Sequence, residues 1–168
     1  MSRTPTVGRS SFHHESHRHL LSQVQNLTPR PVDAIIVPTA RTVHYLHTAV
    51  SLARHHRCTL VALCSGLAKA AKTIELAEQH GVEVVAVDIK DLPGRLVPEF
   101  ATSAVLDGTK YGSTFKRRTD TSLKRNLGLL LAHVADWNRI VFLDDDITVP
   151  RPEDLNDAAG LLDRYAGV

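Results

Sequence analysis

Short, fully apolar segments alternate with longer segments of mixed polarity from Asp33 onward. The apolar segments lie at residues 34–39 (AIIVPT), 59–65 (TLVALCS), 82–89 (VEVVAVDI) and 139–144 (RIVFLD). Each has the length of one strand and is rich in β-branched residues, which is typical of strands covered on both faces. The pattern therefore predicts four strands in the interior of a sheet.

The segments between and after these strands repeat apolar residues at helical spacing, at residues 41–57, 66–81, 120–138 and 153–167. In the segment 120–138, the stripe that we expect to face the sheet consists of Leu123, Leu127, Leu130, Leu131 and Val134. Strands that alternate with helices indicate an α/β fold, in which a mainly parallel sheet has helices on both faces.

Two regions interrupt this rhythm. Residues 1–30 contain a cluster of histidines among Ser, Thr and Arg, and we expect a flexible His-rich arm ahead of a domain at residues 31–168. A transition-metal site is the alternative for the histidines. Residues 90–119 are rich in Pro, Gly and polar residues and end in a basic cluster at 116–118, so we expect a long loop that a bound ligand would order.

Composition favours one domain. The chain has 168 residues, of which 43% are hydrophobic, and its formal charge of +2 gives no sign of a nucleic-acid binder. We expect Cys58 and Cys64 to be buried free thiols in a reducing cytosol. No apolar run approaches about 18 residues, and the N-terminus has no signal-peptide core, so we expect a cytoplasmic protein without a membrane span.

Three consecutive carboxylates, Asp144, Asp145 and Asp146, follow the last expected strand. Like charges this close repel and raise one another's pKa unless a cation or hydrogen-bond donors offset them. One interpretation is a solvated turn that caps the helix expected near Glu153. The segment is therefore either a charged turn or a site that holds something positive.

A second interpretation is a phosphoribosyltransferase, because VFLDDDIT superficially matches the apolar, acidic and threonine run of that family. There the chain continues into a threonine-glycine turn whose backbone amides bind the 5-phosphate. Here Pro150 and Pro152 follow, and proline has no amide N–H to donate. The match fails at this turn.

A third interpretation is a divalent-metal site for a nucleotide diphosphate. Along an extended backbone, Asp144 and Asp146 would point to the same side and Asp145 away from them. Two carboxylate ligands with open positions for phosphate oxygens suit Mg²⁺ or Mn²⁺. Such a metal would neutralise the carboxylates and act as a Lewis acid on the departing diphosphate.

The segment LKRNLGLLLAHVADWNRIVFLDDDI, at residues 123–147, resembles the core of glycosyltransferases with the A-type fold, in particular the large inverting family that uses nucleotide sugars. An Arg-Asn-x-Gly helix, matched by Arg125, Asn126 and Gly128, precedes an apolar strand that ends in an Asp-x-Asp motif. The resemblance spans about residues 33–165. It implies the Rossmann-like nucleotide-binding half of an A-type glycosyltransferase, with a nucleotide-diphosphate sugar as donor and Mn²⁺ or Mg²⁺ as cofactor.

The resemblance also implies roles for single residues. Asp144 would contact the ribose or sugar and, with Asp146 as the leading ligand, the metal, while Asp145 would be secondary. Arg125 would reach the diphosphate or base. The remaining residues assigned to nucleotide binding are Thr39 and Arg41 after the first strand, Ser65 after the second and Asp88 after the third.

The sequence departs from the family in two respects. The acidic residues expected beside Ser65, where the base is read, are missing, and Asp88 is the candidate to replace them. No segment corresponds to the acceptor-binding half with its catalytic base, which we expect to be absent or truncated. The sequence leaves open an active transferase or a non-catalytic module completed by a partner chain or homo-oligomer. It also leaves open the base, the sugar, the acceptor and the stereochemical outcome.

Overall fold

The computed structural model describes residues 27–94, Val105 and residues 120–168. Most of the expected N-terminal arm and most of the expected loop at 90–119, including its basic cluster, lie outside the described residues. The last residues of the arm run along the C-terminal helix, where Arg30 N–H donates to the Asn156 carbonyl at 3.0 Å.

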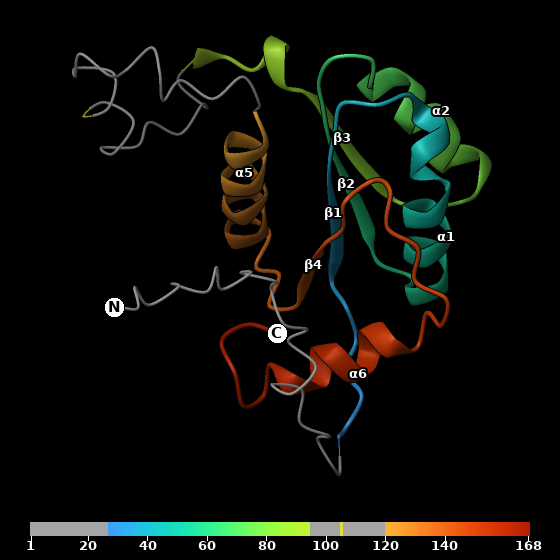
Figure 1. Cartoon of the computed structure of the whole chain (residues 1–168), viewed down its shortest axis with the longest axis vertical. Coiled ribbons are helices and arrows are strands. Elements are labelled where there is room, and N and C mark those ends of the chain that lie inside the picture. Colours follow the sequence, from blue (N-terminus) through green and yellow to red (C-terminus); the bar gives the residue numbers. More distant parts are fainter. Residues whose placement is uncertain (1–26, 95–104, 106–119) are drawn as a thin grey trace, which may run out of the picture.

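The described strands form one parallel sheet with the order β3-β2-β1-β4 (Figure 1). Their bounds are β1 Ala34–Thr39, β2 Thr59–Cys64, β3 Val84–Asp88 and β4 Ile140–Phe142. The helices are η2 Val43–Leu46, α1 His47–His56, α2 Ala70–Gln79, η3 Ile89–Asp91, α5 Thr121–Val134 and α6 Asp154–Leu161. The predicted α/β fold with a parallel sheet is confirmed.

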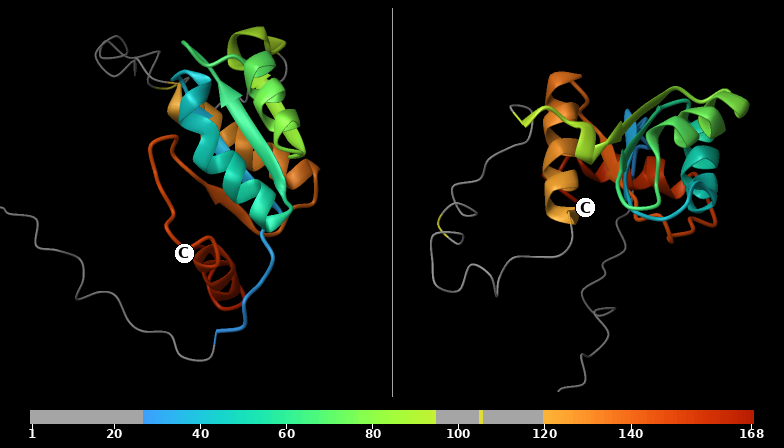
Figure 2. Two further views of the ribbon diagram at one scale, coloured as in Figure 1. Left: turned by 90° about the vertical axis from the view of Figure 1, so that its right-hand side faces the viewer. Right: turned by 90° about the horizontal axis from the view of Figure 1, so that it is seen from above.

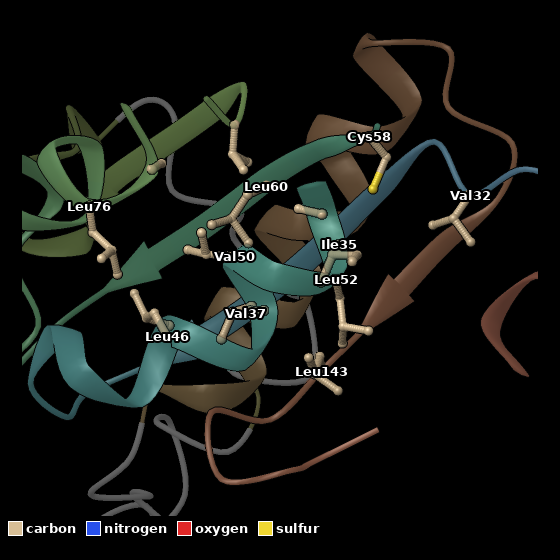
Figure 3. Packing of buried hydrophobic residues seen from close by; sticks show 14 of the residues in the cluster. Val32, Ile35, Val37, Leu46, Val50, Leu52, Cys58, Leu60, Leu76 and Leu143 are labelled. Carbon is tan, nitrogen blue, oxygen red and sulfur yellow. The ribbon is translucent and has the colours of Figure 1, made fainter. Parts of the chain in front are cut away.

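Helices cover both faces of the sheet (Figure 2, right). On one face, Ile35 and Val37 of β1 pack with Leu60 of β2 against α1 and α2, and Figure 3 shows this cluster. On the other face, Ile36 and its neighbours pack against Leu127 of α5. Because both faces of the sheet are covered, the central strands are apolar at nearly every position, with Thr39 and Thr59 as the exceptions.

Several predicted boundaries are wrong; the last helix, for example, ends at Leu161 rather than near residue 167. Two other boundaries have a clear local cause. The second helix begins at Ala70 rather than at Gly66, because Gly66 has a φ of +55° and Leu67 N–H donates to the Ala40 carbonyl at 2.9 Å. β4 ends at Phe142 rather than at Asp144. In both places a turn begins where the residue types alone favoured a longer regular element.

The face that α5 turns to the sheet is rotated from the predicted stripe: Leu127 is buried as expected and Leu131 packs against the same cluster, but not every member of the stripe faces the sheet. Leu130 and Val134, two members of the expected stripe, are 44% and 76% exposed. The buried face runs instead through Lys124, Leu127, Gly128 and Ala132. Gly128 permits the close approach, since a Cβ there would lie 2.9 Å from both Ile36 Cγ2 and Phe142 Cε1.

No helix in the described parts of the chain combines the length and apolar content needed to cross a bilayer.

Substitution Gly128→Val should destabilise the fold, because the added methyl groups would enter space filled by Ile36 and Phe142. Overpacking of this kind costs about 1–3 kcal/mol, which urea denaturation followed by circular dichroism would measure. Thr121→Val is the control on the same helix, because Thr121 is exposed. An unchanged midpoint for Gly128→Val would contradict the packing described for α5.

Both cysteines are free and buried, as predicted. Burial raises the pKa of the Cys58 thiol to about 11, and it also raises the pKa of Cys64. Since only the thiolate attacks a disulfide reagent, both thiols should react slowly with Ellman's reagent near pH 8 in the folded protein. They should react at once in urea, and reaction of the folded protein at the rate of a free thiol would contradict this placement.

Candidate functional site

The candidate site lies at the carboxyl edge of the sheet, beside the point where the strand order reverses. The chain proceeds from β1 through β2 to β3 on one side, and β4 then adds on the other side of β1. Ligands of open parallel sheets bind outside the carboxyl ends of the strands at such a reversal. Here the residues after β1 meet the residues after β4.

Asp144, Asp145 and Asp146 lie in a tight turn, closed by Ile147 N–H donating to the Asp144 carbonyl at 3.1 Å. The extended backbone on which the expected orientation of these carboxylates rested is therefore wrong. Their side chains are 55%, 10% and 51% exposed, respectively. Asp145 thus faces the protein, and Asp144 and Asp146 remain half-exposed.

Each of the three carboxylates has its own principal partner. Arg125 lies 3.1 Å from Asp144, and the Thr39 hydroxyl donates to Asp145 at 2.7 Å. These contacts come from α5 and from the end of β1, two elements that are distant in the chain. They offset the repulsion that three adjacent carboxylates would otherwise produce.

Arg41 pairs with the remaining carboxylate, Asp146. Its guanidinium lies 3.0 Å from Asp146 and 3.6 Å from Asp145, and it stacks over the Tyr45 ring at 4.9 Å from the ring centroid. The hydrogen bond with Asp146 raises the pKa of Arg41, and the charge of Asp145 adds to this. The Tyr45 ring thus packs against the flat face of the Arg41 guanidinium, whose N–H groups face the carboxylates.

Lys124 is the residue of this region that the sequence reasoning missed. Its side chain is 2% exposed, and its ammonium donates at 2.7 Å to both the Thr39 carbonyl and the Ser65 hydroxyl. It also lies 2.9 Å from Asp120. The sequence contained a signal for this position: Lys124 is one turn before Gly128 and therefore on the same face of the helix. A lysine in a helix is nevertheless normally assigned to the solvent face.

Asp120 completes this network at the start of α5. Burial acts to raise its pKa, but the hydrogen bonds from Lys124 and Ser65 outweigh burial, and the pKa of Asp120 is lowered. Asp120 therefore remains a carboxylate that accepts hydrogen bonds. It is an acidic residue near Ser65 that comes from a distant part of the chain.

The structure brings together most of the residues assigned to the site. Those around the turn after β4 are Thr39, Arg41, Arg125, Asp144, Asp145 and Asp146, and Ser65 joins them through Lys124. Asp88 lies apart, at the end of β3, where it accepts a hydrogen bond from Ala70 N–H at 3.3 Å. In this position it stabilises the first turn of α2.

Within the described residues, no group of three or more His, Cys, Asp or Glu side chains is arranged to hold a metal ion. The half-exposed pair Asp144 and Asp146 offers two carboxylates beside two arginines. Mg²⁺ in nucleotide sites usually takes one or two carboxylates and completes its shell with phosphate oxygens and water. This donor set fits a metal that arrives with a diphosphate.

No family model matches this chain, and no curated protein matches it either. The functional argument therefore depends on the site itself.

The stability of the fold should depend on the charge of Asp120. Because its pKa is lowered in the folded state, its contribution is complete above the unfolded pKa of about 4 and is lost as the pH falls through the lower, folded value. The difference in unfolding free energy between wild type and Asp120→Asn should thus be largest at neutral pH and shrink as the pH falls below the unfolded pKa of about 4.

Urea titrations of both proteins at several pH values measure this difference. Asp157→Asn, which changes an exposed aspartate of α6, is the matched control and should show little difference at neutral pH. A gap between wild type and Asp120→Asn that stays constant over the whole pH range would show that the Asp120 charge is not part of the network.

Proposed function

We propose that this domain binds a nucleotide-diphosphate sugar with Mn²⁺ or Mg²⁺ at the carboxyl ends of β1 and β4, as the donor-binding half of a metal-dependent glycosyltransferase. The observation that supports the proposal is the half-exposed pair Asp144 and Asp146 at the reversal of strand order, flanked by Arg41 and Arg125. The sequence resemblance to A-type glycosyltransferases at residues 123–147 adds to it.

The charges of the site suit this ligand. A diphosphate and two carboxylates repel each other, so their joint presence requires a cation between them. Asp144 and Asp146 would hold that cation, and Arg41 and Arg125 are near enough to turn toward phosphate oxygens, which guanidinium groups bind in a bidentate manner. The metal, when bound, supplies Lewis acidity to the departing diphosphate.

Sugar transfer also requires a base for the acceptor hydroxyl. Three acidic residues of the C-terminal part have partners away from the site: Glu153 lies near His55, Asp154 pairs with Arg151, and Asp163 pairs with Arg139 next to the start of β4. The fourth, Asp157, is exposed on α6. The site residues found in the described parts thus all serve the donor side. We therefore propose a donor-binding half that transfers sugar poorly or not at all by itself.

Asp146→Asn should remove most of the metal dependence of binding. Calorimetry would compare UDP, GDP and dTDP, each with Mn²⁺ and with EDTA, on wild type and on the variant. Loss of a charged metal ligand should weaken binding in Mn²⁺ at least about tenfold and bring it to the level measured in EDTA. Asp157→Asn, on the exposed face of α6, should bind like wild type.

Equal affinity with and without metal for all three nucleotides would contradict the metal-dependent site. Binding of phosphoribosyl diphosphate in preference to every nucleotide would favour the phosphoribosyltransferase alternative. Repeated release of nucleotide diphosphate from a sugar donor with an acceptor panel, abolished by Asp146→Asn, would show a complete enzyme rather than a binding half.

A further inference from the structure

We propose that Lys124 is the positioning residue of the carboxyl edge: its buried ammonium group sets the placement of Thr39 and Arg125, the two residues that pair with Asp145 and Asp144. This role is a property of the chain without ligand. Its consequence for nucleotide binding rests on the function proposed above.

The ammonium group is fully used. A lysine has three N–H donors, and the three acceptors here are the Thr39 carbonyl, the Ser65 hydroxyl and the Asp120 carboxylate. They belong to the end of β1, the turn after β2 and the start of α5. A single side chain therefore connects two strand ends to a helix.

The contact with Thr39 reaches the carboxylates directly. The Thr39 carbonyl accepts from Lys124, while its hydroxyl donates to Asp145 at 2.7 Å and accepts from Arg41 N–H at 3.3 Å. Thr39 is 1% exposed, so its backbone has little freedom to move independently of these partners. Fixing the carbonyl thus fixes the direction of the hydroxyl.

The second route passes through α5. Lys124 is adjacent to Arg125, and the ammonium contacts hold the first turn of the helix at one rotation about its axis. One turn later, Gly128 lies against Ile36 and Phe142, which fixes the distance of the helix from the sheet. Together these two contacts aim Arg125 at Asp144, at 3.1 Å.

A charged residue is a costly means of filling this space. Burying a charge is unfavourable unless it is paired and hydrogen-bonded, and an apolar residue of similar size is often no less stabilising. A methionine at this position would lack the directional hydrogen bonds that the ammonium group donates to three elements. The geometry therefore points to placement, rather than stability alone, as the role of the lysine.

Hydrogen exchange of the ligand-free protein tests this role. In Lys124→Met, the amides at the carboxyl edge should lose protection at least about tenfold, the reporters being Ser65 N–H, which donates to the Thr39 carbonyl, and Ile147 N–H. Asp33 N–H, which donates to the Arg139 carbonyl at the opposite edge of the sheet, should keep its protection. Lys72→Met is the control, since Lys72 forms an exposed pair with Glu75 on α2.

Ser65→Ala provides a milder variant should Lys124→Met fail to fold, because it removes only one of the three acceptors. It should give the same regional pattern with a smaller change. An equal loss of protection at both edges would assign Lys124 to global stability and overturn the proposal. Unchanged protection at the carboxyl edge would overturn it as well.

Measuring nucleotide binding by wild type and variants tells a failure of this inference apart from a failure of the proposed function. At a temperature where all variants are folded, Lys124→Met should bind nucleoside diphosphate with Mn²⁺ about tenfold more weakly than wild type, and Lys72→Met should bind equally well. If wild type does not bind, the proposed function fails, and hydrogen exchange alone decides the role of Lys124. If wild type and Lys124→Met bind equally, Lys124 does not position the site.

Discussion

Repulsion among three adjacent carboxylates is the constraint on which the carboxyl edge of this domain depends. Asp144, Asp145 and Asp146 are consecutive in the chain and follow a strand that is paired with β1, so they cannot separate widely. The carboxylates find partners in two other parts of the fold: Thr39 at the end of β1 with Arg41 just after it, and Arg125 on α5. Parallel pairing of β1 with β4 makes this possible because it brings the ends of the two strands to one edge.

The fold class could be predicted from the sequence because it depends on periodicity over whole segments. Continuous apolar runs at β1 and β2 and the helical stripes between them are averaged over many residues, so single exceptions change little. Boundaries depend on single residues. The turn at Gly66 and the early end of β4 at Phe142 arise from local hydrogen bonds that no periodicity reports.

The face of α5 shows a different limit of sequence reasoning. A helix with leucine or valine at many positions offers more than one apolar stripe, and counting apolar residues selected one that contains Leu130 and Val134. In the structure Leu127 of that stripe is buried, but the face turned to the sheet is rotated toward Lys124 and Gly128. This face is favoured by tertiary contacts: Gly128 lets the helix approach Ile36 closely, and the Lys124 ammonium finds three acceptors. Neither contact can be inferred from the helix sequence alone. The same is true of the meeting of Asp120 with Ser65.

The contacts of the site differ in how readily they can be exchanged. Arg41, Arg125 and their partners Asp144 and Asp146 are about half-exposed, and solvent-exposed ion pairs contribute little to stability. Under the proposed function, an arriving cation with a phosphate would therefore replace these ion pairs at little cost.

The contacts of Thr39 and Lys124 are buried, and breaking them would leave polar groups without partners, at about 1–3 kcal/mol for each group. Under the proposed function, a fixed layer of buried hydrogen bonds thus supports an outer layer of exchangeable charges. The arginines would hold the carboxylates in place until the ligand takes over that role, and the buried layer would keep its arrangement throughout.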